Sequence, residues 1–281
     1  MPVYNAAKTL EEAVQSVIHQ SESSWELLLV NDGSTDGSAE LMDELVARHP
    51  GCAIEIVHQE NKGLGAARNT GILRASGSYI ALLDADDIWH DDKLAQCRPF
   101  LEKTPECDVL YHQVETFGLD QKRVRKAHAV NEMDDLLVRG NPIVPSAVVL
   151  RAELVQEELF ATEERFHGAE DLELWLRLLH KGARFYYWPE PLTYYREAGG
   201  MSNRIKEHLR HVLEVLEEGY KRGYFYRITV EKARQRKFYE VGRFFQKRGA
   251  HHEANYYFSL ADARSVKLSG LKILNALGIR Y

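Results

Sequence analysis

Hydrophobic residues recur along the first 200 positions with two alternating patterns, one typical of amphipathic helices and one typical of short buried strands. Over residues 9–20, Leu10, Val14 and Val17 fall on one helical face, and Thr9 with Glu12 resembles a capping box. The pattern predicts further elements in alternation: strands at 25–30, 53–58 and 79–83, and helices around 41–46 and at 63–75. This order indicates βαβ units, and therefore an α/β fold with a mainly parallel sheet.

The beginning of the chain departs from that alternation. Met1–Asn5 has the composition of a strand leaving for a loop, but no strand-forming residues stand in front of it. In a βαβ arrangement the helix that begins near Thr9 should be preceded by a strand. We therefore expect the sheet to lack its first strand.

Three carboxylates, those of Asp84, Asp86 and Asp87, directly follow the apolar run at residues 79–83. In open α/β sheets, ligands bind outside the carboxyl ends of the strands. Crowded carboxylates repel one another unless a cation lies among them, and Mg²⁺ or Mn²⁺ prefers oxygen ligands together with substrate phosphates. The segment thus indicates a metal-assisted phosphate site, although acidic residues after a strand also serve as turn formers or helix caps.

Composition narrows the class of protein. The 281 residues are 44% hydrophobic, enough for one large domain and an appendage. A net charge of -6 argues against nucleic acid as a partner. The three cysteines, Cys52, Cys97 and Cys107, lack metal-type spacing and suit a reducing compartment. No apolar run approaches the ~20 residues that span a bilayer, so we expect a cytoplasmic protein.

Five segments, taken in order, resemble the motifs of one enzyme family. They are Pro2–Asn5, Val30–Gly37, Asn61–Gly71, Asp84–Asp87 and Gly168–Arg177. Together they are similar to the family 2 nucleotide-sugar glycosyltransferases, inverting enzymes with the GT-A fold. The resemblance implies a GT-A domain over residues 1–202 and leaves 203–281 as a helical C-terminal extension.

The resemblance also implies roles in binding the donor. Pro2 and Tyr4 would lie at the nucleotide base, with Tyr4 stacked on it, and Asp32 would accept a hydrogen bond from a base N–H. Arg68 would reach the base or a phosphate. Judged from the residues alone, Asp32 is explained as well by turn formation, and Arg68 by a solvated helix face.

The Asp-x-Asp element of the family maps to Asp84 and Asp86. Asp86 is the expected ligand of a divalent metal, Mn²⁺ or Mg²⁺, which would bridge the diphosphate of the donor. Asp84 would belong to the donor site and could contact the ribose. Relatives often carry a histidine near Ala198, within a flap over the diphosphate, so this chain lacks that third protein ligand.

Asp171 is the expected general base. Glu170 and Asp171 precede a helical apolar pattern that ends at Lys181–Gly182. Acids at a helix N-terminus commonly do no more than favour the macrodipole. In the family, however, the second acid of this pair removes the proton from the acceptor hydroxyl, which supports a single inverting displacement.

These features together predict a glycosyltransferase that moves a sugar from a nucleoside-diphosphate sugar to an acceptor hydroxyl, in cell-surface polysaccharide or glycoconjugate synthesis. The acceptor would be a sugar or a lipid-linked glycan. Two alternatives stay open: an inactive nucleotide-sugar-binding scaffold, and a nucleotidyltransferase, although Pro2–Lys8 lacks the basic glycine-rich loop of the latter.

A segment near the end of the chain is a candidate membrane-binding site. Residues 267–277 are basic and amphipathic, and they could lie on an anionic membrane surface near a lipid-linked acceptor. This would make the enzyme peripheral at the inner face of the membrane. The alternative is a last helix that packs on the catalytic domain.

The expected gap in the sheet has a consequence for stability. Family members have an apolar strand running into the segment that corresponds to Pro2–Asn5. Each buried backbone group left unpaired costs ~1–3 kcal/mol. We therefore expect the 281-residue chain to express poorly, and a chain with roughly six to ten further residues ahead of Met1 to melt more than about ten degrees higher.

Overall fold

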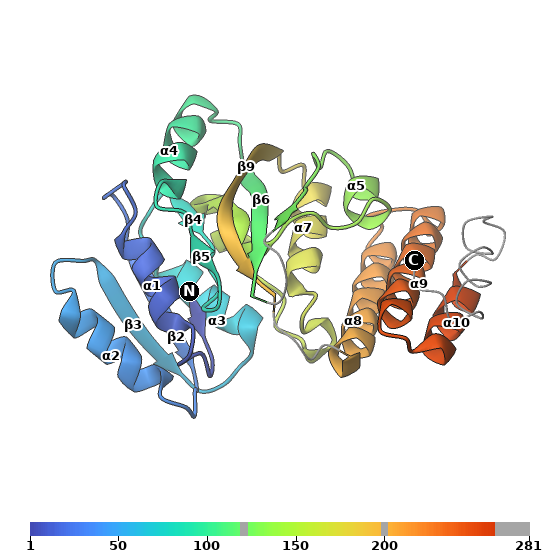
Figure 1. Cartoon of the computed structure of the whole chain (residues 1–281). Helices are drawn as coiled ribbons and strands as arrows, with labels where there is room; N and C mark the ends of the chain where they lie inside the picture. Colours follow the sequence, from blue (N-terminus) through green and yellow to red (C-terminus); the bar gives the residue numbers. More distant parts are fainter. Residues whose placement is uncertain (119–122, 198–201, 262–281) are drawn as a thin grey trace. The chain divides into compact units, whose positions relative to one another are not determined.

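The computed structural model describes residues 1–118, 123–197 and 202–261, which form two compact units (Figure 1). The first unit comprises Met1–Glu132 with Pro142–Gly199, and the second comprises Met133–Asn141 with Gly200–Tyr281. In the first unit the elements are β1 Pro2–Val3, α1 Leu10–Ile18, β2 Leu27–Asp32, α2 Ser38–Arg48, β3 Ile54–Gln59, α3 Leu64–Arg74, β4 Tyr79–Ala81, β5 Ile88–Trp89, α4 Lys93–Lys103, β6 Val109–Phe117, β7 Arg123–Arg125, the 3₁₀ turn η1 Pro145–Ala147, β8 Val148–Arg151, α6 Ala152–Glu157, η2 Glu164–Phe166, α7 Glu170–His180 and β9 Phe185–Arg196.

The first sheet consists of the parallel strands β1, β2 and β3 in that order. Alternate residues of β2 point to opposite faces. Leu27 and Leu29 join the core cluster formed with α1 and α2, whereas Val30 packs with Ala67 of α3. Helices therefore cover both faces of this sheet, which is the α/β arrangement predicted from the alternating pattern.

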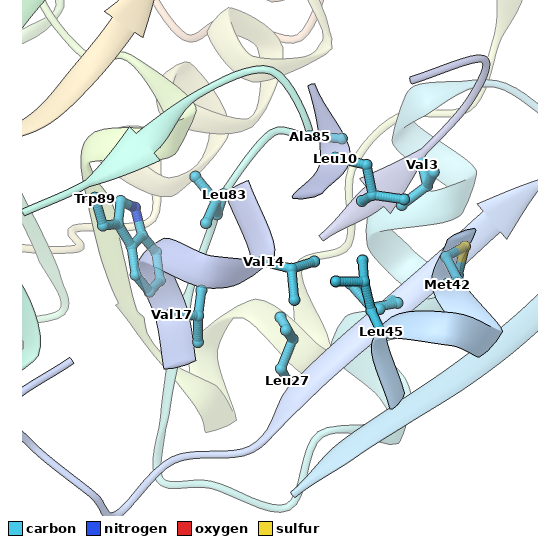
Figure 2. Packing of buried hydrophobic residues seen from close by; sticks show 11 residues of the cluster. Val3, Leu10, Val14, Val17, Leu27, Met42, Leu45, Leu83, Ala85 and Trp89 are labelled. Carbon is cyan, nitrogen blue, oxygen red and sulfur yellow. The ribbon is translucent and has the colours of Figure 1, made fainter. Parts of the chain in front are cut away.

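One core cluster also holds the acidic segment in place (Figure 2). Leu83, Ala85 and Trp89 are buried in this cluster beside Val14 and Val17 of α1. The buried residues bracket Asp84, so apolar packing fixes the backbone of the segment on both sides of the carboxylate. Asp84 and Asp86 remain outside the cluster and partly open to solvent.

The second sheet has six strands, in the order β4-β8-β6-β9-β5 with β7 beside β6. Within it β6 and β9 are parallel, and the other pairs are antiparallel. The parallel pattern thus holds for the first sheet, while the second is mixed. Only residues 118–122 separate β6 from β7, too few for the crossover that a parallel pair requires.

Strand β1 is two residues long and pairs with β2, and the expected loss of stability stays a prediction. Among the described strands, β4 pairs with β8 and not with β1, so the two sheets are separate. A cavity of about 800 Å³ lies where they part, lined in part by Leu28, Ile80 and Leu82. The Met1 amine reaches into this region and donates to the Leu28 carbonyl oxygen at 2.7 Å; burial lowers the pKa of that amine to about 5.

The second unit is helical, as predicted for the C-terminal extension. It contains α5 Met133–Leu137, α8 Ser202–Lys221, α9 Arg227–Lys247 and α10 His251–Leu260. Its apolar core includes Phe245, Ala254 and Phe258. Residues 267–277 lie outside the described residues. None of the helices that the structure describes has the length and apolar character needed to cross a bilayer.

The capping box predicted at the start of α1 is wrong. Thr9 does occupy the N-cap position, but its hydroxyl donates to the Ala6 carbonyl oxygen at 3.3 Å and makes no cap bond. Glu12 instead forms an ion pair with Arg196 at the end of β9. The Glu12 carboxylate, which a capping box would direct to the Thr9 backbone N–H, is bound by Arg196 instead.

Candidate active site

A buried arginine joins two of the predicted motifs. Arg68, on the inner side of α3, donates through Nη2 to both carboxylate oxygens of Asp84, at 2.8 and 3.1 Å. Through Nη1 it donates to Glu170 at the start of α7, at 3.4 Å. The segment after β4 and the Glu170–Asp171 pair are therefore parts of one site, although far apart in the sequence.

The charges of Arg68, Asp84 and Glu170 depend on one another. Burial disfavours the Arg68 guanidinium, but the carboxylates of Asp84 and Glu170 outweigh it and raise the pKa of Arg68. Arg68 Nε and Glu170 Oε2 are buried and have no hydrogen-bond partner among the residues that the structure describes. The nucleotide contact predicted for Arg68 stays a prediction, since its two terminal nitrogens both contact carboxylates in the structure.

Asp171, the predicted base, lies half-buried in the first turn of α7. Burial and the adjacent charge of Glu170 raise the pKa of Asp171 to about 6, although the positive charge of Arg68 opposes the shift. A carboxylate with a raised pKa is a stronger proton acceptor than an ordinary surface aspartate, while it remains ionised at neutral pH. These properties suit a general base.

The three acids after β4 differ in their surroundings. The Asp86 side chain is exposed to solvent at one end, and burial together with the charge of Asp84 raises its pKa. Asp87 is buried, and its Oδ1 accepts the Arg196 backbone N–H at 2.8 Å. Burial and the charge of Asp84 raise the pKa of Asp87 to about 7. Asp86 is therefore the most exposed of the three carboxylates.

The exposed side of the cluster, at Asp86, offers carboxylate oxygens as candidate ligands for a divalent cation. Asp86 forms no ion pair in the part of the chain that the structure describes, and Asp87 Oδ2 is buried without a hydrogen-bond partner. No group of three or more His, Cys, Asp or Glu among the described residues is arranged to hold a metal ion by itself. The donor set thus suits a hard cation that takes its remaining ligands from phosphate oxygens and water. Ala198 lies outside the described residues.

The loops expected to hold the nucleotide base lie together at the end of the first sheet. The Asn5 backbone N–H donates to the Ser34 hydroxyl at 3.1 Å, and Asn5 Oδ1 accepts the Thr35 N–H at 2.8 Å. Tyr4 is exposed, as a stacking platform must be before its ligand arrives. Pro2 is part of β1 beside β2.

Asp32 is more enclosed than its predicted role suggests. The carboxylate is buried and accepts hydrogen bonds from Gln59 Nε2 at 2.7 Å and from the backbone N–H groups of Lys62 and Gly63, each at 2.9 Å. Gly63 has a φ of +88°, which explains the glycine there. Asp32 thus holds the turn into α3, and its contact with the base stays a prediction.

The family models and the relatives agree on the family of the chain. A model of glycosyl transferase family 2 matches residues 1–147, and a model of glycosyl transferase family group 2 matches residues 79–263. The chain belongs to glycosyl transferase family 2. Two Bacillus subtilis (strain 168) proteins are similar to this glycosyltransferase. The first, "Putative glycosyltransferase EpsE", is 31% identical in an alignment that covers 70% of this chain and 71% of the relative's length. The second, "Putative teichuronic acid biosynthesis glycosyltransferase TuaG", is 33% identical in an alignment that covers 69% of this chain and 76% of the relative's length.

A solved structure supports the fold. The mannosyltransferase PcManGT from Pyrobaculum calidifontis, in complex with GDP-Man and Mn²⁺, superposes with a TM-score of 0.67 at 19% sequence identity. The match covers 98% of this chain and 78% of the other. The GT-A-type α/β fold predicted from the motifs is thereby confirmed.

Sequence reasoning missed a buried residue that supports the acidic segment of this glycosyltransferase. The Ser146 carbonyl oxygen accepts hydrogen bonds from three side chains: Trp89 Nε1 at 2.9 Å, Lys93 Nζ at 2.7 Å and Thr193 Oγ1 at 3.1 Å. The Ser146 hydroxyl in turn accepts the Asp84 N–H at 3.1 Å. Because each partner comes from a different element, no spacing in the sequence signals this network.

Lys93 and Arg196 are the cations that sequence reasoning missed. Lys93 is fully buried at the start of α4, and burial lowers its pKa to about 7. Arg196 donates through Nε to the Asp86 backbone carbonyl oxygen at 2.8 Å. The one sequence signal was the spacing of Trp89 and Lys93, whose Nζ lies 4.1 Å from the centroid of the Trp89 ring.

We expect Arg68→Met to lower the free energy of unfolding by about 3–5 kcal/mol, because it leaves the carboxylates of Asp84 and Glu170 crowded without their cation. Denaturant unfolding measures the change. Arg74→Met is the matched control, since Arg74 lies on the same helix in an exposed ion pair with Glu55 and should cost less than ~1 kcal/mol. Equal losses in the two variants would show that Arg68 does not hold the motifs together.

Proposed function

We propose that this glycosyltransferase moves a sugar from a nucleoside-diphosphate sugar to an acceptor hydroxyl, with inversion and with a divalent metal, Mn²⁺ or Mg²⁺. The observation that carries the proposal is the Arg68 bridge, because it brings the carboxylate cluster for the diphosphate and the Glu170–Asp171 pair into one site. Residues 1–202 would form the catalytic GT-A domain, and 203–281 its helical extension.

The donor would lie across the loops that follow β1 and β2. Pro2 and Tyr4 contact the base, with Tyr4 as the stacking surface. Asp32 accepts a hydrogen bond from a base N–H, and Arg68 reaches the base or a phosphate. Asp84 lies next to the ribose and diphosphate. That PcManGT was solved with GDP-Man supports a nucleotide-sugar donor for this fold.

Asp86 would hold the metal. When bound, the cation neutralises the negative charge that develops on the departing nucleoside diphosphate. The Asp86 side chain is exposed to solvent, and Arg196 fixes its backbone through the Asp86 carbonyl oxygen. Asp87 and Ser146 keep the segment from moving as the ligand binds.

Asp171 would act on the acceptor. Its carboxylate takes the proton of the acceptor hydroxyl while the hydroxyl oxygen forms a bond to the anomeric carbon. The bond from that carbon to the diphosphate oxygen breaks on the opposite face, and its electron pair leaves with the nucleoside diphosphate. A single displacement of this kind inverts the anomeric configuration.

The proposed setting is the synthesis of cell-surface polysaccharide or glycoconjugate, with a sugar or lipid-linked glycan as acceptor. The relative TuaG, named for teichuronic acid biosynthesis, supports this setting. We further propose a cytoplasmic enzyme that works peripherally at the inner face of the membrane.

A screen of nucleotide sugars by thermal shift, with Mn²⁺ present, tests the proposal first. A ligand that binds only the folded state raises the melting temperature. The best ligand is then used to measure release of nucleoside diphosphate on addition of glycan acceptors. Binding without release for every acceptor would favour an inactive scaffold, and release of pyrophosphate from a nucleoside triphosphate would favour a nucleotidyltransferase.

The raised pKa of Asp171 predicts the pH dependence of transfer. The base acts in its ionised form, so kcat/KM for the acceptor should fall about tenfold for each pH unit below about 6, and should level off above it. The measurement is made with saturating donor and metal. A profile that stays flat from about pH 5 to about pH 7 would show that another group accepts the proton.

A further inference from the structure

Charge is distributed unequally along the chain. Residues 203–281 carry 17 Lys and Arg against 8 Asp and Glu, a formal net charge of +9, whereas residues 1–202 carry 19 against 34, a net charge of -15. The overall value of -6 therefore conceals a strongly basic C-terminal unit. A net positive charge of this size favours an anionic partner.

Large apolar side chains project from the turn that joins α8 to α9. Tyr226 is 83% exposed and Ile228 is 62% exposed, while Tyr220 is exposed at the end of α8. The turn itself is well packed, because Phe225 is buried with its ring against Gly219, where a Cβ would lie only 2.8 Å from the ring atoms. A fixed turn therefore presents these side chains to solvent.

Cations surround the same turn. Lys221 is the last residue of α8, Arg222 lies in the turn and Arg227 is the first residue of α9; residues 219–230 contain no acidic residue. Arg222 pairs with Glu218 at 2.8 Å. Lys221 and Arg227 are exposed and form no ion pair in the described part of the chain. We name Tyr220–Ile228 the basic aromatic turn.

We infer that the basic aromatic turn docks this enzyme on an anionic lipid bilayer. Tyrosine and isoleucine side chains enter the interfacial region of a bilayer, where an aromatic ring can keep its hydroxyl in water. Lys221 and Arg227 would lie at the level of the lipid phosphates. The inference rests on the proposed function, because it names the surface on which a lipid-linked acceptor would be presented, and it assigns the contact to a different segment from residues 267–277.

Binding of the full chain to vesicles tests the inference without any substrate. Phosphatidylcholine vesicles with and without phosphatidylglycerol are the probes, and co-sedimentation is the readout. Lys221→Ser with Arg227→Ser should weaken binding to the anionic vesicles about thirtyfold. Tyr226→Ser with Ile228→Ser should weaken it about tenfold or more.

Matched variants control for charge and apolar surface elsewhere in the same unit. Arg210→Ser with Lys247→Ser removes two exposed cations away from the turn, and Tyr256→Ser with Leu260→Ser removes exposed apolar side chains of α10. Both control variants should bind vesicles within about twofold of the parent chain. All four variants should keep the melting temperature and the nucleotide-sugar thermal shift of the parent chain.

Three results would overturn the inference: equal binding to neutral and anionic vesicles, equal losses in the turn and control variants, or no binding by the parent chain. Loss of binding in Lys267→Ser with Lys272→Ser, but not in the turn variants, would assign the contact to residues 267–277 instead. Failure of the proposed function is a separate result, because an inactive protein would still give a clear answer in the vesicle assay.

Discussion

Asp171→Asn is expected to abolish sugar transfer while leaving donor binding nearly intact. Asparagine keeps the size of the side chain but cannot accept the proton of the acceptor hydroxyl. The base acts in the transition state and not on the bound donor, so kcat should fall ~10²–10⁴-fold with little change in the affinity for the nucleotide sugar. Steady-state transfer kinetics and calorimetric titration of the donor measure the two quantities.

Glu164→Gln is the matched control for this prediction. Glu164 lies in the exposed turn η2 shortly before α7, and its substitution also removes one negative charge without changing the length of the side chain. It should leave both quantities unchanged. Transfer at a near wild-type rate in Asp171→Asn would mean that the base is elsewhere, and Glu170 would be the first alternative despite its ion pair with Arg68.

Asp86→Asn should produce the second large effect, the loss of metal-dependent nucleotide binding in a protein that stays folded. Asp86 is partly exposed and forms no ion pair among the described residues, so the substitution breaks no structural contact of its carboxylate. Without that ligand the cation binds poorly and the departing diphosphate keeps its charge. Turnover should therefore fall by several orders of magnitude.

Isothermal titration of nucleoside diphosphate, with Mn²⁺ and with EDTA, measures the effect of Asp86→Asn. The parent chain should bind more tightly with the metal, and the variant should bind with one weak affinity in both conditions. Asp91→Asn, an exposed acid a few residues further on, should behave like the parent. Unchanged affinity in Asp86→Asn under both conditions would remove Asp86 from the metal site.

Local pattern was sufficient to place several of the first elements within one or two residues. The predicted helix at 63–75 is observed as Leu64–Arg74, and the predicted strand at 53–58 as Ile54–Gln59. Apolar periodicity identifies such elements because their burial depends on the face that each residue occupies. The strand direction in the second sheet could not be read in this way, because β8 and β6 pair through contacts between distant residues.

The candidate site was predictable to a similar extent. The change from apolar Leu83 to charged Asp84 marks the end of the buried strand residues, so the carboxylates could be identified from the sequence. Arg68 could not, since an arginine on a helix face has the same local pattern whether it is solvated or enclosed by carboxylates. Its enclosure follows from its contacts with Asp84 after β4 and with Glu170 of α7, which no local spacing encodes.

The Arg68 bridge also constrains how relatives of this enzyme can diverge. Substitution of Arg68 alone leaves the carboxylates of Asp84 and Glu170 crowded in a place where burial penalises their charge, so this single exchange is strongly disfavoured. Exchanges at these positions should therefore occur together across related sequences, as correlated pairs and not as independent changes. A double-mutant cycle on Arg68 and Glu170 would measure the interaction energy between the two side chains. A large interaction energy would mean that a sequence with only one of the two exchanges is strongly destabilised.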